Sequence, residues 1–308
     1  MFDIFFLGTG ASVPSKERAL PCVALRRGPD VILFDCGEGS QRQLMISPLS
    51  FMKIGAVFIT HLHGDHFYGL PGLLQTMGMS NRKNPLTICG PEGIADAVKT
   101  SLAVCEGDIG YELEIREMSP GDTVTAGEIS VTAYRTEHGI ASLGYVAREP
   151  DTRGKIDAAK AGALGIRGKD FSVLEAGGEV NGVRLSDVVS SSRKGISVAY
   201  SGDTEMCQTE KDAVRGTDVL IHESTYADAD SDLATMHHHS TAAQVAALAA
   251  ESGCRALMLV HTSGRYKDSD VILTEAGRIF RKTFLPCDFS QYRVTAGDVR
   301  SVSGCPPS

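Results

Sequence analysis

The 308-residue sequence lacks the features of an exported or membrane protein. Its N-terminal segment has neither the basic start nor the small-residue cleavage site of a signal peptide, and no apolar run approaches the roughly 20 residues of a membrane span. The eight cysteines include no Cys-x-x-Cys pair, so they argue for reduced thiols rather than a disulfide framework or a thiolate zinc site. These absences predict a cytoplasmic protein that does not associate with membranes.

An excess of positive charge is also missing. The sequence holds 30 Lys and Arg against 38 Asp and Glu, which gives a formal net charge of −8. This excludes a surface that attracts nucleic acid uniformly, so any RNA binding requires a local basic patch. With 42% apolar and 22% charged residues, the composition is that of an ordinary globular protein. The length suits a single large α/β domain over residues 1–308.

The most informative stretch is a histidine-rich motif that follows an apolar run. Residues 56–59, Ala-Val-Phe-Ile, predict a buried strand, and Thr-His-Leu-His-Gly-Asp-His follows directly at 60–66. Imidazole nitrogens and carboxylate oxygens at a strand end are typical of a metal site. The alternative is a surface loop that is rich in histidine by chance.

The spacing within the motif favours two metal ions over one. His61 and His63 are two residues apart and can converge on one ion where the strand ends. Asp65 and His66 follow a turn at Gly64, so they point elsewhere and would be idle unless a second ion used them. Paired ions roughly 3.5–4 Å apart are the arrangement that stabilises a displacement at phosphorus.

The motif resembles the signature of the metallo-β-lactamase superfamily. Its continuation at 67–74, Phe-Tyr-Gly-Leu-Pro-Gly-Leu-Leu, is similar to that of tRNase Z, the endoribonuclease family that trims the 3′ end of precursor tRNA. The resemblance implies a four-layer αβ/βα sandwich with an inserted arm, two Zn²⁺ per subunit and a homodimer. Manganese or iron would fit the same ligands. The alternation of predicted strands and helices along the chain indicates an α/β fold, which is consistent with that sandwich.

The resemblance extends the ligand set to three more strand ends. It makes His138 the third histidine of the first ion, His261 the last ligand of the second ion, and Asp203 the carboxylate shared by both. A carboxylate suits the shared position because its two oxygens can bind two hard centres while its charge lowers their repulsion. Taken alone, a histidine such as His138 is more often structural. The implied ligands are His61, His63 and His138 for one ion, Asp65, His66 and His261 for the other, and Asp203 between them.

Two further motifs carry the chemistry that the resemblance implies. The segment 222–225, His-Glu-Ser-Thr, resembles the family's His-Glu-Ala-Thr motif, and His-Ser-Thr at 239–241 is another family motif. By resemblance, His239, oriented by Glu223, donates a proton to the departing ribose oxygen. A histidine paired with a carboxylate can hold that proton near neutral pH. Asp65 is expected to orient or deprotonate the attacking water.

Other polar residues have both a functional and a structural interpretation. Asp35 closes a predicted strand and, as in the family, can hold the second nitrogen of a ligating histidine. Lys16 and Arg18 match the family's Pro-x-Lys-x-Arg-Asn loop beside the RNA 3′ end, with Ala19 replacing the asparagine. A solvated charged loop is the alternative there. Arg265 is a further candidate for substrate phosphate, and a structural salt bridge is equally plausible for it.

Residues 148–194 are the least regular part of the chain. They hold nine Lys or Arg and seven Asp or Glu, a small positive balance in an acidic protein. Parts of this segment resemble the arm that tRNase Z inserts to grip the tRNA elbow, although Gly168-Lys169 stands where the family has Gly-Pro. Phosphate contacts set affinity without reading sequence, which suits an enzyme that accepts many tRNAs. A loop unrelated to RNA is the alternative.

The sequence therefore predicts a zinc-dependent endoribonuclease that removes the 3′ trailer from precursor tRNA and leaves a 3′ hydroxyl. Another dinuclear metal phosphodiesterase on the same fold is the first alternative, favoured if the segment 148–194 does not contact RNA. A non-catalytic RNA-binding partner is the second alternative, and the intact ligand set argues against it.

Overall fold

The chain is organised as two compact units, one of which interrupts the sequence of the other. The computed structural model describes residues 1–104, 108–190 and 192–304. The larger unit comprises Met1–Glu149 and Ile196–Ser308, and the smaller unit comprises Pro150–Gly195. The smaller unit thus covers nearly the same residues as the predicted insertion. No helix in the described ranges is long and apolar enough to cross a membrane.

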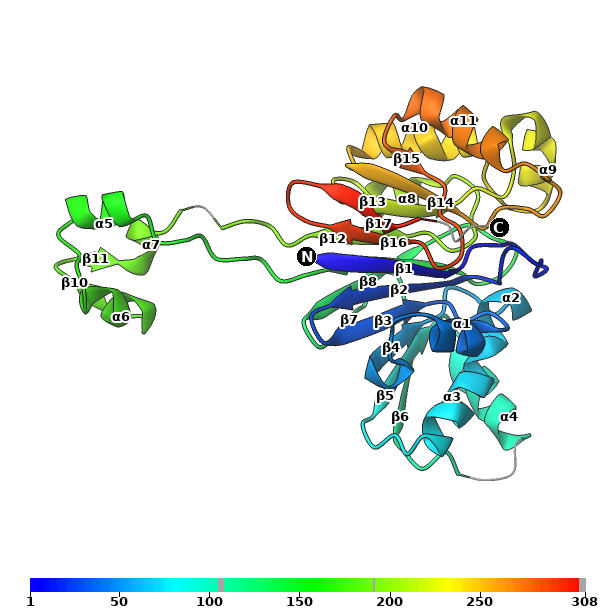
Figure 1. The fold of residues 1–308 in the computed structure, drawn as a ribbon, viewed down its shortest axis with the longest axis horizontal. Coiled ribbons are helices and arrows are strands. Elements are labelled where there is room, and N and C mark those ends of the chain that lie inside the picture. The colour runs from blue at the N-terminus through cyan, green and yellow to red at the C-terminus, as the bar shows by residue number, and fades with distance from the viewer. Residues whose placement is uncertain (105–107, 191, 305–308) are drawn as a thin grey trace. The chain divides into compact units, whose positions relative to one another are not determined.

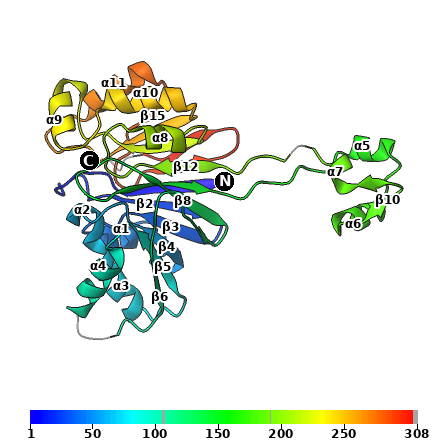
Figure 2. The same cartoon turned by 180° about the vertical axis from the view of Figure 1, so that it is seen from behind.

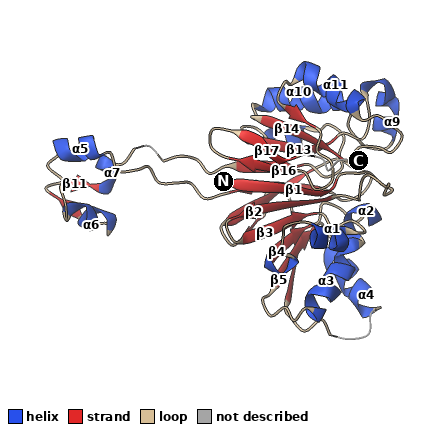
Figure 3. Cartoon of the chain, viewed as in Figure 1, coloured by secondary structure: helices blue, strands red, loops and turns tan. Residues whose placement is uncertain are grey.

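The larger unit contains two β-sheets (Figure 1, Figure 3). The first has eight strands in the spatial order β17 (Val299–Ser303), β16 (Gln291–Val294), β1 (Phe2–Gly8), β2 (Cys22–Arg27), β3 (Asp30–Phe34), β4 (Ile54–Phe58), β5 (Leu86–Gly90) and β6 (Leu113–Glu117). The second has seven in the order β15 (Thr283–Phe284), β14 (Ala256–Val260), β13 (Val219–Glu223), β12 (Ser197–Tyr200), β9 (Leu143–Arg148), β8 (Ile129–Arg135) and β7 (Thr123–Ala126).

Helices cover the outer face of each sheet in the larger unit (Figure 1, Figure 2). The first sheet carries α1 (Ser40–Ile46), α2 (Gly64–Phe67), α3 (Gly69–Met79) and α4 (Ile94–Ala103), with a short 3₁₀ turn at Phe51–Lys53. The second carries α8 (Gln208–Ala213), α9 (Ser231–Met236), α10 (Ala242–Ser252) and α11 (Asp270–Ile279), with a 3₁₀ turn at Asp228–Asp230. Helix, sheet, sheet and helix make four layers, so the expected αβ/βα sandwich is confirmed.

A stack of aromatic rings joins the two sheets in the core. Phe34 ends β3 of the first sheet, and its ring lies 5.1 Å from that of Tyr200 and 5.9 Å from that of Tyr145, both from the second sheet. Each tyrosine also donates its hydroxyl across the interface, Tyr145 to the Ile59 carbonyl at 2.6 Å and Tyr200 to an Asp35 carboxylate oxygen at 2.8 Å. These contacts fix the ends of the central strands relative to one another.

The local signals around α10 explain where this helix begins and ends. The Thr241 hydroxyl accepts from the Gln244 amide, and the Gln244 side chain accepts from the Thr241 amide, which is a capping box. Gly253 ends the helix in the left-handed conformation with φ 72°. Both features are local signals that can be read from the sequence.

The C-terminal segment joins the first sheet, and one cysteine differs from the sequence expectation. β16 pairs with β1, so residues beyond Pro286 complete the first sheet. In the described ranges Cys22, Cys36, Cys89, Cys207 and Cys254 are free thiols, whereas Cys287 is disulfide-bonded. The prediction of reduced cysteines is therefore wrong for Cys287.

The smaller unit has a core of its own. It contains α5 (Ala158–Ala163), α6 (Asp170–Glu175), β10 (Glu179–Val180), β11 (Val183–Arg184) and α7 (Leu185–Val188). Its buried apolar residues are Ala161, Ile166, Leu174, Val183, Leu185 and Val188. Elements this short leave little periodicity in the sequence, which is why the segment was expected to be irregular.

Candidate metal centre

The histidine motif lies where a buried strand of the first sheet ends. The chain remains tied to the sheet one residue past β4, because the Ile59 amide donates to the Cys89 carbonyl at 2.8 Å. His61 is then fully buried, and the chain turns into α2 at Gly64, which leaves His66 buried in that helix. The predicted strand and turn are therefore present, and both deliver side chains to the same edge of the sheet.

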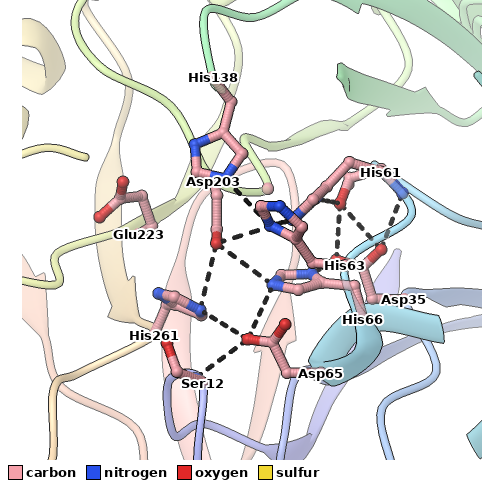
Figure 4. Close-up of polar contacts among 12 residues, drawn as sticks. Ser12, Asp35, His61, His63, Asp65, His66, His138, Asp203, Glu223 and His261 are labelled. Atoms are coloured by element: carbon pink, nitrogen blue, oxygen red, sulfur yellow. Dashed lines mark hydrogen bonds and ion pairs between the residues drawn. The ribbon is translucent and has the colours of Figure 1, made fainter. Parts of the chain in front are cut away.

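Two groups of side chains converge at this edge (Figure 4). Donor atoms of His61, His63 and His138 lie within 4.8 Å of one another, and those of a second group do likewise. His138 follows β8 of the second sheet, and its Nε2 lies 3.3 Å from His63 Nδ1. The members of the second group are Asp65, His66, Asp203 and His261.

Asp203 lies between the two groups. Its Oδ2 is 3.3 Å from the Nε2 atoms of both His66 and His261 and 3.9 Å from His61 Nε2. Asp203 and His261 follow β12 and β14 of the second sheet, whereas His61 and His66 come from the first. The structure thus brings all seven predicted ligands together from both sheets.

Four of the imidazoles are held by a contact outside the cluster. The pairs are His61 Nδ1 with Thr60 Oγ1 at 3.0 Å, His66 Nδ1 with Asp35 Oδ2 at 2.8 Å, His138 Nδ1 with the His238 carbonyl at 2.9 Å, and His261 Nδ1 with Thr225 Oγ1 at 2.9 Å. In each ring Nδ1 is engaged and Nε2 is directed toward the other ligands. Contacts of this kind orient metal-binding histidines and select the tautomer that leaves the ligating nitrogen available.

Three buried polar atoms in the cluster fit a cation. His66 Nε2, Asp203 Oδ1 and His261 Nε2 are shielded from solvent and have no hydrogen-bond partner among the described residues. Buried polar atoms nearly always have a partner, and imidazole nitrogens with carboxylate oxygens are the donors that divalent metals prefer. The residues present therefore form a divalent-metal site.

The electrostatics of the cluster favour the states that a cation requires at Asp203, His61 and His138. Burial alone would raise the pKa of the Asp203 carboxyl, but His261, His66 and His61 hold it well below its usual value. Burial lowers the pKa of His61 and of His138, so both rings are neutral at pH 7. Ionised carboxylates and neutral imidazoles are the forms that bind metal. At His66 the carboxylates of Asp203 and Asp35 outweigh burial and raise the pKa well above its usual value, so this ring has to release a proton when a cation binds.

A histidine–carboxylate pair lies beside the cluster. His239 Nδ1 is 2.8 Å from Oε1 of Glu223, a buried carboxylate that also accepts from the amides of Ser240 at 3.0 Å and Thr225 at 2.9 Å. Burial lowers the pKa of His239, but Glu223 outweighs it and raises that pKa to about 9. His239 therefore carries a proton at neutral pH, as the sequence motif predicted.

A second buried pair behind this site was not found from the sequence. His222 Nε2 lies 3.0 Å from Glu210 Oε1, and both side chains are fully buried. His222 Nδ1 lies 2.7 Å from the Glu223 carbonyl oxygen, which fixes the strand end that presents Glu223. Glu210 belongs to α8, and no sequence spacing relates this helix residue to a strand residue twelve positions away.

The three basic residues predicted to contact substrate have different environments. The Arg18 guanidinium donates to Thr9 Oγ1 at 2.6 Å and to the Pro286 carbonyl at 3.0 Å, so it anchors its own loop. Lys16 is exposed and lines a pocket of about 780 Å³ that Arg18 also lines.

Arg265 has structural partners of its own. Its Nη1 lies 3.4 Å from Asp230 Oδ1, and its Cζ lies 5.4 Å from the centre of the Tyr226 ring.

The metal cluster opens into a cleft of about 530 Å³. Ser12 lines this cleft, and its amide donates to Asp65 Oδ2 at 3.0 Å. Tyr226 also lines the cleft, and the His237 ring stacks on it with the ring centres 6.4 Å apart. Sequence reasoning missed Ser12 and Tyr226, because neither a loop amide nor a lone aromatic residue carries a spacing signal.

Comparison with known families gives one match to a domain model. A model described as β-lactamase superfamily domain matches residues 31–262. This range begins at β3 and ends just after His261, so it contains all seven side chains of the metal cluster.

Curated relatives match over nearly the whole chain. A ribonuclease Z of Methanosarcina acetivorans is 40% identical over 302 residues, covering 96% of this chain and 98% of the relative. A ribonuclease Z of Bacillus subtilis is 37% identical over 309 residues, covering 96% of this chain and 100% of the relative. The crystal structure of human tRNase Z, short form, matches with a TM-score of 0.71 and 28% identity, covering 95% of this chain and 99% of that one.

The metal site predicts a ligand-dependent stability. Adding Zn²⁺ to chelator-treated protein should raise its unfolding temperature, because binding to the folded state alone adds about 2.7 kcal/mol when free metal is 100 times Kd. Asp203→Ala should lose most of this gain, since Asp203 lies between both groups. Calorimetry with metal analysis measures the effect, and Asp212→Ala, which removes an exposed carboxylate paired with Arg215 at 3.2 Å, is the control. If Zn²⁺ raises the unfolding temperature of Asp203→Ala as much as that of the wild-type protein, Asp203 is not a metal ligand.

Proposed function

The chain belongs to the β-lactamase superfamily and, within it, to the ribonuclease Z family, and from this we propose that it is a zinc-dependent endoribonuclease that removes the 3′ trailer from precursor tRNA. One observation carries the proposal. Seven nitrogen and oxygen donors from both sheets converge beside a protonated histidine. Metal ligands together with a general acid are what the hydrolysis of a phosphodiester with a poor leaving group requires.

The ligands divide between two cation positions. His61, His63 and His138 would hold one Zn²⁺, and the group with Asp65, His66 and His261 the other, with Asp203 shared. When bound, such ions act as Lewis acids on a phosphodiester and lower the pKa of water. Manganese and iron fit the same nitrogen and oxygen donors, so metal content has to be measured.

The protein's own side chains supply orientation and a proton. The amide of Ser12 fixes one carboxylate oxygen of Asp65, which leaves the other oxygen to orient the attacking water. His239 presents Nε2 to the cleft while Glu223 holds Nδ1, so the proton on Nε2 can pass to the departing 3′ oxygen. The products are then a 3′ hydroxyl on the tRNA and a 5′ phosphate on the trailer.

The smaller unit is the proposed tRNA-binding arm. Residues 150–195 hold eight Lys or Arg and six Asp or Glu, so this unit is net positive in a chain of net charge −8. Arg153, Lys160, Arg167 and Lys169 are all exposed. Exposed cations bind phosphates without reading bases, as an enzyme for many tRNAs needs. The homodimer and the cytoplasmic location stay predictions, the first measurable by sedimentation.

A cleavage assay tests the function directly. The zinc-loaded protein should cut a defined precursor tRNA at the start of its trailer and cut a small chromogenic phosphodiester far less efficiently. Chelator should abolish both activities. Asp65→Ala should abolish cleavage and leave binding of the precursor largely intact, because Asp65 belongs to the metal cluster and is not part of the smaller unit. Efficient cleavage of the small diester without cleavage of precursor tRNA would favour another phosphodiesterase, and binding without cleavage an RNA-binding protein.

The role of His239 predicts a leaving-group effect. His239→Ala should slow cleavage by roughly 10²–10⁴-fold, the usual contribution of a general acid. A precursor with sulfur in place of the bridging 3′ oxygen should recover most of that loss, because a thiolate departs without a proton. Asp65→Ala is the control and should not be rescued.

The same pair sets the alkaline limit of the reaction. The Glu223 charge raises the pKa of His239, so the acid form persists at neutral pH and is lost as pH rises toward about 9. Glu223→Gln should move the alkaline limb of the kcat profile to lower pH. An unchanged limb, or no rescue by sulfur, contradicts the assignment.

If the smaller unit binds tRNA, substitutions in it should weaken precursor binding without changing the rate of phosphodiester hydrolysis at the metal centre. Replacing Lys160, Arg167 and Lys169 with Ala should weaken precursor binding and reduce the dependence of log K on log salt by about one unit for each phosphate that the variant no longer neutralises. Cleavage of a small diester should not change. Arg184→Ala is the matched control, since Arg184 is already paired with Glu179 at 2.9 Å. Equally weakened binding in the control and the triple variant refutes the arm's role.

A further inference from the structure

Tyr68 is an exposed aromatic residue at the edge of the metal centre. It joins α2 to α3, two residues after His66, and 71% of its surface is accessible. Among the described residues its hydroxyl has no hydrogen-bond partner, and its ring contacts one other ring, that of Phe67, at 6.3 Å. Neither packing nor polar bonding in the folded chain therefore accounts for an aromatic side chain at this position.

The backbone holds Tyr68 in a fixed position. A Cβ at Gly64 would lie 2.5 Å from Cε2 of Tyr68, so the ring lies directly against the Gly64 backbone. The next residue, Gly69, donates its amide to the Cys36 carbonyl at 2.9 Å, and a Cβ there would lie 1.9 Å from the Gly37 oxygen. The Cδ2–Cε2 edge of the ring lies against Gly64, and the backbone that carries the ring is anchored at Gly69, so little entropy is lost when a ligand covers an exposed face of the ring.

The ring borders an open depression of about 480 Å³ that adjoins the metal centre. Val13, Pro14 and Leu20 supply its apolar lining, and its charged lining residues are Glu38 and Asp65. Its lining in the described part of the chain includes no Lys or Arg, so this depression does not attract phosphate. A flat, uncharged group fits the aromatic and aliphatic lining instead.

A second pocket adjoins the depression and includes basic residues in its lining. The pocket of about 780 Å³ shares Pro14 and Glu38 with the depression, and its lining includes Lys16 and Arg42, both exposed. The depression in turn shares Ser12, Val13, His63 and Asp65 with the catalytic cleft. Cleft, depression and this second pocket therefore adjoin in that order. The second pocket is also lined by the carboxylates of Glu17, Glu38 and Asp288, so a phosphate that follows the base in the depression would be placed beside Lys16 or Arg42.

We propose that Tyr68 stacks on the base of the first trailer nucleotide, the one that keeps the cleaved phosphate. This rests on the proposed function. The leaving 3′ oxygen faces His239, so the tRNA-side nucleotide lies toward His239 and Tyr226. Neither of these residues lines the depression, which meets the centre at His63 and Asp65. The depression is thus on the trailer side. Stacking tolerates any base, because every base has a π-face.

Kinetics on modified precursors test the stacking. The full zinc-loaded protein cleaves a precursor tRNA that is intact, abasic at the first trailer position, or abasic at the third. On the intact precursor, Tyr68→Ala should lower kcat/KM about tenfold or more, as expected for loss of one base–aromatic stack, and Tyr68→Phe should stay within about twofold of wild type. With the first trailer base removed, Tyr68→Ala and wild type should cleave alike. On the precursor that lacks the third trailer base, Tyr68→Ala should show the same reduction in kcat/KM relative to wild type as on the intact precursor.

Controls separate this inference from the proposed function. Met79→Ala, at the far end of α3 and 77% exposed, should match wild type on every precursor. A small phosphodiester without a base should be cleaved equally by Tyr68→Ala and wild type. The stacking proposal is overturned if Tyr68→Ala cleaves the intact precursor normally, or if its defect persists when the first trailer base is absent. Failure of the wild-type protein to cleave any precursor would instead overturn the proposed function, and the stacking with it.

Discussion

The buried carboxylate of Asp35 joins the parts that the metal centre depends on. It lies at the end of β3 and accepts from the Thr60 amide at 2.8 Å, the Tyr200 hydroxyl at 2.8 Å and His66 Nδ1 at 2.8 Å. Tyr200 belongs to the second sheet and the other partners to the first. A buried carboxylate costs several kcal/mol unless its oxygens are satisfied, so the sheets are stable in the one arrangement that supplies these donors. The same arrangement turns His66 toward Asp203.

Local sequence signals predict where some strands end and some helices begin in this molecule. The apolar run before His61 and the capping box at Thr241 are local signals, and the structure contains both. The convergence of His138, Asp203 and His261 was expected from family resemblance, since no local pattern says which strand ends meet. Glu210 and Tyr200 could not be assigned from the sequence, because their roles arise from contacts between elements distant in the chain.

Charge explains why binding and chemistry occupy different parts of the chain. The centre concentrates the carboxylates of Asp35, Asp65, Asp203 and Glu223 in a protein of net charge −8, and carboxylates repel an RNA backbone. Bound cations reverse the local sign at the reacting phosphate and at no other. Affinity for the remaining phosphates must come from elsewhere, and the net-positive unit of residues 150–195 is the proposed source.

The close approach of backbones around the motif makes the centre rigid. Gly202 has φ 62°, and a Cβ there would lie 2.7 Å from Thr60 Cβ, so the loop before Asp203 packs directly on the histidine motif. Gly69 packs as tightly on Gly37. Larger residues at these positions would separate the ligand-bearing loops by more than a metal site tolerates. The precise placement of the metal ligands therefore comes from the close packing of these loops. The proposed RNA contacts depend on charge and on aromatic stacking, neither of which requires a particular RNA sequence.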